Sequence, residues 1–264
     1  MLKLKFLDKK TAKKYFIKCD YLKKIGSQEI NLRSTRYMQT AVTRIELMEN
    51  YFDSVLSFSS EEKMYIEKIH KKAISLLFNV NYIAKNEEYV YMKVHGTLDW
   101  HNSFVISENC IILPFRLFYN TQENEFLKNI LSCIIYCNQQ KEKNYYDGFY
   151  NNLFGFEKID ENKIIVLKDE KRIITNPNGL QREWIINLCD GFYLPCLILH
   201  NEELVSCLLP LKKFSDYYVT KSEPIIASTR EDYVNLTCCI DKKEKLDHPN
   251  EIFASFLMKK IFFS

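Results

Sequence analysis

The chain has 264 residues, a formal net charge of only +3, and 47% hydrophobic residues. This length and composition predict a folded globular protein and exclude an intrinsically disordered one. Six glycines and six prolines supply few sharp turns, which argues against an all-β sandwich or barrel and favours helices with some sheet.

The cysteines and the apolar runs indicate the cell compartment. Nine cysteines, an odd number without regular spacing, do not form a recognisable disulfide framework. Reduced thiols of this kind are typical of a cytosolic or nuclear protein. Charges interrupt residues 1–10 before a secretory signal can form, and no apolar run approaches membrane-spanning length. We therefore expect a cytoplasmic protein without a membrane-embedded segment.

The first 24 residues carry the excess positive charge. They hold nine lysines against Asp8 and Asp20, a charge of +7 that leaves −4 for the other 240 residues. Clustered lysines gain affinity for polyanions such as RNA because binding releases phosphate counterions. The predicted polyanion-binding residues are Lys3, Lys5, Lys9, Lys10, Lys13, Lys14, Lys18, Lys23 and Lys24. The competing interpretation, and the commoner one in a lysine-rich chain, is the solvated face of a first helix or strand.

Two amphipathic helices are predicted next. Apolar residues recur at steps of three and four between residues 34 and 56, which is the period of a core-facing helix. Ser59 and Glu62 then have the spacing of a capping box, and apolar residues continue at helical spacing to Leu77. The two segments predict a helical hairpin.

A pair of strands is predicted before the central helix. Residues 89–94 and 104–113 are rich in β-prone residues, a polar loop separates them, and Pro114 ends the second run. Residues 120–144 then repeat apolar side chains at steps of three and four, and Asn120 with Glu123 resembles a capping box. This helix is the element about which we expect the rest of the chain to be arranged.

Two cysteines distinguish the central helix. Cys133 and Cys137 are four residues apart, so their thiols lie on one face, separated by roughly 6 Å of rise. A zinc peptidase carries its two histidines at this spacing, with a glutamate after the first histidine. Ile134 occupies the position of that glutamate.

The last part of the chain predicts further strands and a terminal helix. Residues 176–179, Asn-Pro-Asn-Gly, predict a turn between two β-prone runs, and strands are expected at 192–199 and 204–209. Residues 212–245 show no sustained pattern, and residues 247–249 signal the start of a short helix. We expect a basic N-terminal segment at 1–30 and a single α+β domain at 31–264.

Three stretches together resemble HExxH zinc metallopeptidases of the glutamate-zincin type. They are CIILP at 110–114, NPNG at 176–179 and HPNEIFASF at 248–256. The resemblance implies a zincin-like α+β fold, with a helical hairpin, a small edge sheet, and a central helix on which a C-terminal helix packs. It also implies that Glu251 corresponds to the zinc-binding glutamate of the family.

The same resemblance implies the loss of catalysis. Gln140 and Lys141 fit a Gln-Arg pair that follows the zinc helix in the family, which places Cys133 and Cys137 in the histidine positions and Ile134 in that of the glutamate. A zinc hydrolase needs a carboxylate to take a proton from metal-bound water, and isoleucine cannot do so. The sequence therefore predicts a pseudoenzyme without a cofactor, a binding or inhibitory factor on a larger assembly such as the ribosome.

Two enzymatic alternatives remain. Cys133, Cys137 and Glu251 are candidate zinc ligands of an atypical metal-dependent hydrolase, since cysteine is a normal zinc ligand. Cys133 or Cys137 is also a candidate nucleophile with His101 or His248. Against both, we favour packing of the two thiols in the core, because cysteine is among the residues most often buried.

Overall fold

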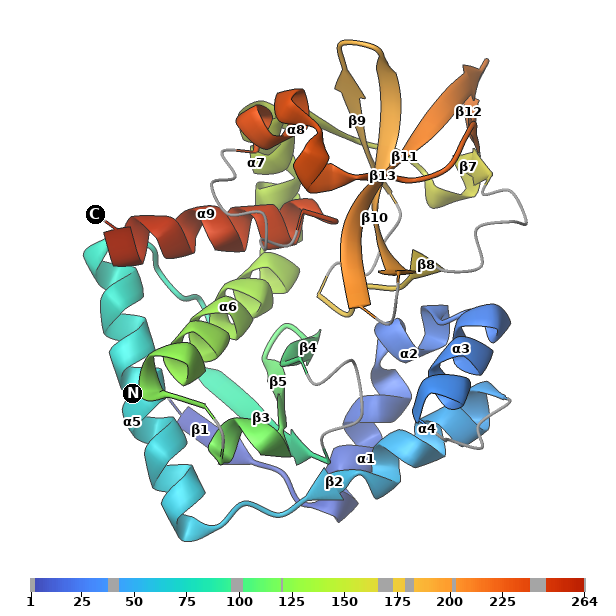
Figure 1. Cartoon of the computed structure of the whole chain (residues 1–264). Coiled ribbons are helices and arrows are strands. Elements are labelled where there is room, and N and C mark those ends of the chain that lie inside the picture. The colour runs from blue at the N-terminus through green and yellow to red at the C-terminus, as the bar shows by residue number, and fades with distance from the viewer. Residues whose placement is uncertain are drawn as a thin grey trace. The chain divides into compact units, whose positions relative to one another are not determined.

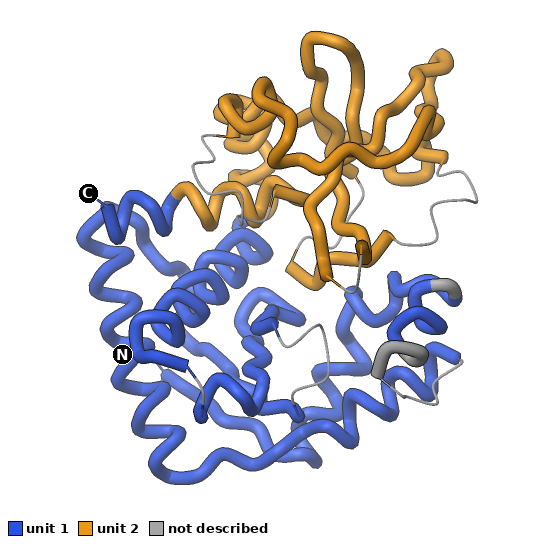
Figure 2. The backbone as a smooth tube through the Cα atoms, in the orientation of Figure 1, with its two compact units in different colours: residues 1–142, 257–264 blue, residues 143–256 orange. Residues whose placement is uncertain are grey.

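The computed structural model describes residues 3–37, 43–95, 102–119, 121–165, 173–178, 183–200, 203–237 and 246–263. Helices and strands are mixed along the chain, as predicted for an α+β protein. The chain divides into two compact units, and Figure 2 colours them separately. Unit 1 comprises residues 1–142 and 257–264, and unit 2 comprises residues 143–256. This division does not coincide with the boundary that we expected at residue 30.

The sheet of unit 1 takes its first strand from the basic N-terminal segment. Its described strands are β1 (Lys3–Phe6), β2 (Val55–Leu56), β3 (Glu88–Val94), β4 (Phe104–Ser107) and β5 (Cys110–Pro114). Their order is β1-β3-β5-β4, with β2 paired to β3. The β1–β3 and β3–β5 pairs are parallel, and the β2–β3 and β4–β5 pairs are antiparallel. The segment at 1–30 is therefore built into this unit, and the sheet is larger than the small edge sheet of the prediction.

The predicted strand at 104–113 is two strands. β4 and β5 form a hairpin around residues 108–109, and β5 returns parallel to β3. The turn is held from outside the hairpin, because the Asn86 side-chain amide donates to the Glu108 carbonyl at 2.6 Å and the Val90 amide donates to the Asn109 carbonyl at 2.8 Å. The turn contains neither glycine nor proline, which are the residues that mark turns most strongly in a sequence, so the sequence did not predict it.

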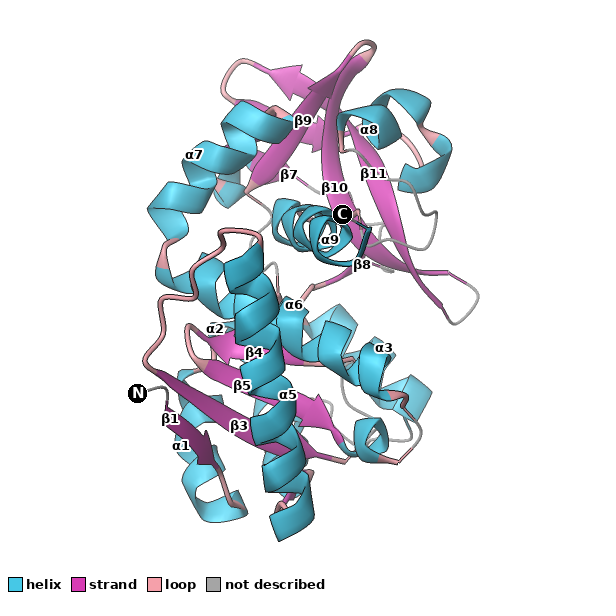
Figure 3. Cartoon of the chain, turned by 90° about the vertical axis from the view of Figure 1, so that its left-hand side faces the viewer, coloured by secondary structure: helices cyan, strands magenta, loops and turns pink. Residues whose placement is uncertain are grey.

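Helices cover both faces of this sheet (Figures 1 and 3). The described helices of unit 1 are α1 (Lys9–Lys18), α2 (Asp20–Lys24), α3 (Ser27–Tyr37), α4 (Arg44–Asp53), α5 (Ser60–Asn79) and α6 (Glu123–Lys141), with a 3-10 turn at Phe115–Phe118. α5 and α6 lie together on one face. On the other face, the ring of Tyr21 in α2 packs edge-on against Phe104 of β4 at 5.9 Å.

The predicted helical hairpin is confirmed only in its second helix. α5 starts after Ser59, and Ser59 and Glu62 form the capping box that the sequence predicted. The first helix, expected over 34–56, is wrong in extent. α3 already begins at Ser27, α4 begins afresh at Arg44, and Val55 belongs to β2. A second capping box, Thr43 with Glu46, starts α4 and carries the same local signal as the first.

The central helix is confirmed, with a correction at its start. α6 begins at Glu123, and its N-cap is Gln122, whose side chain makes no capping bond, rather than the expected Asn120. Asn120 lies outside the described residues. The C-terminal helix α9 (Pro249–Phe263) is longer than the short helix expected. Within unit 1, Lys128 of α6 places its ammonium 5.3 Å from the ring centre of Phe262 in α9.

Unit 2 is built on a long antiparallel hairpin. Its described strands are β6 (Phe156–Lys158), β7 (Ile164–Ile165), β8 (Ile173–Ile174), β9 (Trp184–Leu188), β10 (Gly191–His200), β11 (Glu203–Phe214), β12 (Tyr217–Thr220) and β13 (Ile225–Ile226). Their order is β6-β9-β10-β11-β12-β7, and β8 and β13 pair with β10 and β11. β10 and β11 confirm the strands expected at 192–199 and 204–209, and β11 runs five residues further. One face buries an apolar cluster around Ile185, Leu194 and Leu209.

The helices of unit 2 include one that the sequence analysis missed. They are α7 (Lys143–Phe154), α8 (Glu231–Leu236) and the first part of α9, with 3-10 turns at Glu161–Lys163 and Ala227–Thr229. Tyr146, Tyr150 and Phe154 of α7 are buried and stand four residues apart, which is the helical period. The residues that showed no pattern at 212–245 contain the short elements β12, β13 and α8.

Candidate functional site

The two cysteines of α6 lie in the core of unit 1. Cys133 is 1% exposed, and Cys137 and Ile134 are 0% exposed. Burial raises the pKa of the Cys137 thiol well above its ordinary value, and the neighbouring Cys133 raises it further. A thiol in this setting stays protonated at neutral pH, whereas both nucleophilic attack and zinc binding require the thiolate.

A buried histidine and tyrosine lie beside these thiols. His70 of α5 is 0% exposed, and its Nδ1 lies 2.6 Å from the Tyr91 hydroxyl of β3. Burial lowers the pKa of His70 to about 4, so the imidazole is neutral at physiological pH. Burial also raises the pKa of Tyr91 well above its ordinary value, and Cys133 and Cys137 add to this rise. His70, Tyr91 and Cys137 are therefore all uncharged at neutral pH.

Sequence reasoning did not select His70 or Tyr91. His70 lies on the apolar stripe of α5 with Ile66, Ala73 and Leu77, and that spacing indicated a buried position. The same pattern does not identify Tyr91 of β3 as its partner, because the helical period of α5 does not indicate which strand packs against this helix. The ring of His70 also packs edge-on against Tyr89, with 4.7 Å between ring centres.

The residues described in unit 1 do not fit a zinc site at Cys133 and Cys137. Among His, Cys, Asp and Glu side chains in the described ranges of this unit, no third ligand groups with the two thiols. Zinc held by protein takes at least three ligands, and its cysteines are deprotonated. Within the described part of unit 1 the two thiols lack a third ligand, and their burial is typical of cysteines packed in a core.

Glu251 lies in unit 2, where it joins two of the stretches that carried the family resemblance. Asn176 donates its side-chain amide to Asp247 Oδ2 at 2.6 Å and to Glu251 Oε1 at 3.2 Å. Asn178 donates its side-chain amide to the same Glu251 oxygen at 3.1 Å. Asn250 donates its side-chain amide to the backbone carbonyl of Asn178 at 2.7 Å. The turn at 176–178 and the start of α9 therefore form one hydrogen-bonded unit, which we call the Asn-carboxylate network (Asn176, Asn178, Asp247, Asn250 and Glu251).

The network is buried and extends into the long hairpin. Asn178 and Glu251 are each 2% exposed. Ser206 of β11 donates to Asp247 Oδ1 at 3.2 Å and accepts from the Leu246 amide at 2.9 Å. Buried carboxylates are tolerated when their oxygens accept hydrogen bonds, so the network locks the start of α9 to the sheet. His248 accepts a bond from the Asn250 amide at 3.1 Å, which agrees with its expected place at a helix start.

The N-terminal lysines line the surface of unit 1. Lys3, Lys9 and Lys23 form ion pairs with Glu88, Asp53 and Asp20. Lys10, Lys14 and Lys18 are exposed, stand four residues apart on α1, and form no ion pair within the described ranges. We call these three the α1 lysine stripe. Lys13 and Lys14 also lie near the rings of Phe52 and Tyr15, at 5.5 and 5.8 Å.

One group of potential metal ligands does occur in unit 2, and an arginine occupies it. Among the described residues, Cys189, Asp190 and Asp232 are the only such group of three whose ligand atoms lie within 4.8 Å of one another. Arg230 donates to Asp190 at 2.9 Å and to Asp232 at 2.8 Å. The bond from Arg230 lowers the pKa of Asp232 to about 2. The guanidinium already neutralises both carboxylates, so this group is a surface ion-pair cluster.

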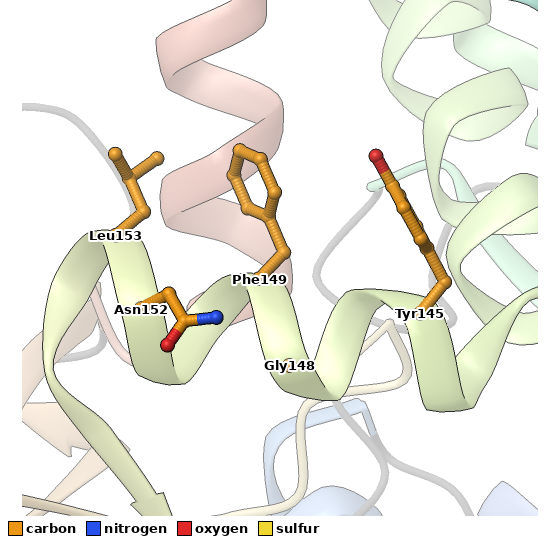
Figure 4. A pocket seen from close by; sticks show the side chains of 5 residues that line it. All are labelled: Tyr145, Gly148, Phe149, Asn152 and Leu153. Atoms are coloured by element: carbon orange, nitrogen blue, oxygen red, sulfur yellow. The ribbon is translucent and has the colours of Figure 1, made fainter.

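A shallow apolar pocket lies on α7. Figure 4 shows Tyr145, Phe149 and Leu153 projecting from one side of this helix, with Gly148 and Asn152 completing the lining. The Phe149 ring packs against Phe253 at 5.1 Å. Aromatic and aliphatic carbon dominates this lining, and it contains no titratable pair.

The other candidates fall outside the described part of the chain. His101 and Gly179 belong to residues that the structure does not describe. In the described part, no helix combines the length and apolar character that crossing a membrane requires. No family model, no curated protein and no solved structure matches this chain.

Proposed function

We propose that the protein is a catalytically inactive relative of the HExxH zinc metallopeptidases that acts as a binding or inhibitory factor on a larger assembly. The observation that carries this proposal is the state of the α6 face. Ile134 is fully buried, and the neighbouring thiol of Cys137 is held in its protonated form. That face offers neither a general base nor a thiolate ligand.

The Asn-carboxylate network supports the kinship part of the proposal. NPNG and HPNE were recognised as separate stretches, and they are bonded through Asn176, Asn178 and Glu251. A buried network of this kind retains carboxylates for structure after catalysis is lost, because removing one member leaves the others unsatisfied. The role of Glu251 is then to hold the turn.

The α1 lysine stripe supports a ribonucleoprotein partner, such as the ribosome. Its three lysines are exposed and form no ion pair in the described ranges, so their ammonium groups are available to phosphates. A cytoplasmic location belongs to the same proposal. The seven cysteines that the structure describes form no disulfide, as expected in a reducing compartment.

Capture from native lysate tests the partner. The tagged full-length chain is expected to retain RNA-containing complexes, and capture is expected to weaken steeply as salt is raised. Replacing Lys10, Lys14 and Lys18 by Gln should reduce capture strongly. The matched control replaces Lys63, Lys71 and Lys128, which are exposed lysines of α5 and α6 in the same unit. Equal capture by both triple variants, or the absence of RNA from the captured material, would overturn the partner assignment.

The alternative function, an atypical hydrolase with Cys133, Cys137 and Glu251 as zinc ligands, is separated by elemental analysis. Purified protein is expected to contain no stoichiometric zinc, because both thiols are buried and no third ligand groups with them in the described part of unit 1. Zinc at one equivalent that disappears on Cys133→Ala would establish the hydrolase candidate instead. Folding of the variant is checked by circular dichroism, so that zinc lost by unfolding is recognised.

A further inference from the structure

The turn between β11 and β12 in unit 2 presents two aromatic rings to solvent. Phe214 and Tyr217 are directly opposite each other across the two strands. Their rings are stacked, with 5.6 Å between centres and an interplanar angle of 14°. They are 38% and 39% exposed, so neither belongs to the apolar core of the unit. In Figure 1 this turn lies at the end of the β11–β12 pair.

Alternation along the strands separates these rings from the core. Tyr218 is buried, and its ring packs edge-on against Phe192 at 5.5 Å on the inner face. Successive residues of a strand point to opposite faces, so Phe214, Tyr217 and the paired residues Lys212 and Val219 share the outer face. Ile165 of β7 pairs with Val219 and is 46% exposed. We call Ile165, Lys212, Phe214, Tyr217 and Val219 the hairpin platform.

Positive charge accompanies the rings. Lys212 places its ammonium 4.9 Å from the ring centre of Phe214. Lys213 belongs to the inner face instead, where its ammonium lies 5.5 Å from the ring centre of Phe192 and 5.6 Å from that of Tyr218. Residues 212–221 contain three lysines and Asp216, a charge of +2. An exposed π-surface beside an ammonium group is a combination that binds single strands, because bases stack on the rings while the lysine contacts a phosphate.

We propose that the hairpin platform binds single-stranded RNA, with a base stacked on the Phe214–Tyr217 pair and a backbone phosphate beside Lys212. The proposal rests on the proposed function for the choice of RNA as the nucleic acid. It adds a second contact, in unit 2, to the α1 lysine stripe in unit 1. The stripe has no stacked ring pair, so it contributes charge, whereas the platform contributes recognition of unpaired bases.

Fluorescence anisotropy with the purified full-length chain tests the proposal. The probes are a labelled oligoadenylate and an abasic oligonucleotide of equal length, which keeps the phosphates and lacks the bases. The wild type is expected to bind the oligoadenylate about tenfold more tightly, the effect of one stacked base. The double change Phe214→Leu and Tyr217→Leu should abolish this preference, because it keeps apolar bulk and removes both rings. Lys212→Gln should weaken binding of both probes and lower the salt slope by about one.

Tyr145→Leu is the matched control, since Tyr145 is an aromatic residue of the same unit and is 66% exposed. It should leave the preference unchanged, and thermal melts confirm that all variants are folded. No preference in the wild type, or a preference that survives the double change, overturns the inference. A further outcome would also overturn the inference: in ribonuclease-treated lysate, the double variant loses a protein that the wild type captures, while its affinity for RNA is unchanged. The platform would then be a contact for a protein. Failed lysate capture with intact oligonucleotide binding would overturn only the proposed function.

Discussion

The Nδ1 atom of His70 lies 2.6 Å from the Tyr91 hydroxyl, and both residues are fully buried between α5 and β3. The low dielectric that surrounds the pair penalises charge on either ring. Because the pKa of His70 falls from 6.5 to about 4 on folding, the unfolded chain takes up a proton at a pH where the folded chain does not. Stability is therefore complete above pH 6.5 and falls as the pH drops from 6.5 to 4.

The pH dependence of unfolding checks this relationship. Between pH 6.5 and pH 4, denaturant titrations of the wild type should show a loss of about 3 kcal/mol attributable to His70. The double variant His70→Phe with Tyr91→Phe removes the titrating group and its hydroxyl partner together, so this component should vanish from its profile. His95→Gln, at an exposed position of the same unit, controls for surface histidines. Parallel profiles for the wild type and the double variant would contradict the assignment.

The Asn-carboxylate network predicts a large effect from one amide. Replacing Asn176 by Leu removes one hydrogen bond to Asp247 and one to Glu251. Each of these buried carboxylates then has one donor fewer. Unsatisfied charged groups cost more than neutral ones, so we expect a loss of about 3 kcal/mol in the free energy of unfolding. Urea denaturation measures it. Asn152→Ala, at an exposed position of α7, should change the same quantity by less than about 0.5 kcal/mol.

Lys93 offers a second test of buried charge, in unit 1. Its ammonium bonds to both Glu62 oxygens, at 2.9 and 2.6 Å, and lies within 6 Å of the ring centres of Phe58, Phe115 and Phe118. Lys93→Met leaves the Glu62 carboxylate without its cation and should cost about 3 kcal/mol. Lys68→Met breaks the exposed ion pair with Glu123 and should cost less than about 1 kcal/mol. Similar melting temperatures for the two variants would show that the buried Lys93–Glu62 pair stabilises the fold no more than the exposed Lys68–Glu123 pair does.

Local signals explain which parts of the fold the sequence predicted. The capping box of Ser59 and Glu62 was read correctly because all of its bonds lie within one helical turn. The same signal at Thr43 and Glu46 was overlooked, since the apolar period on either side suggested one continuous helix. The β4–β5 turn was missed because Asn86, which lies 22 residues before Glu108, holds it.

The candidate site shows the same limit more sharply. Periodicity indicated that Cys133 and Cys137 share a buried face, and the structure places them there. Periodicity did not indicate that His70 and Tyr91 are their neighbours, because α5, β3 and α6 are far apart in the sequence and meet only in the fold. Asn176 and Asp247 are likewise 71 positions apart in the sequence, and their direct hydrogen bond was not predictable from it. Only the resemblance of two short stretches to one family suggested that they belong together.

Ile134 provides the most direct test of the α6 face. Ile134→Glu introduces a carboxylate at the position that the proposed resemblance aligns with the catalytic glutamate, and this position is fully buried. Because the position lies in the apolar core, we expect a loss of several kcal/mol, on the order of the penalty for an unpaired buried charge. The matched control is Ile45→Glu, at a position of α4 that is 70% exposed, and it should be nearly neutral. Thermal melts with and without added zinc measure both effects. If the Ile134→Glu variant is as stable as the wild type, or if zinc stabilises it selectively, the α6 face is open to solvent and metal, and the inactive assignment fails.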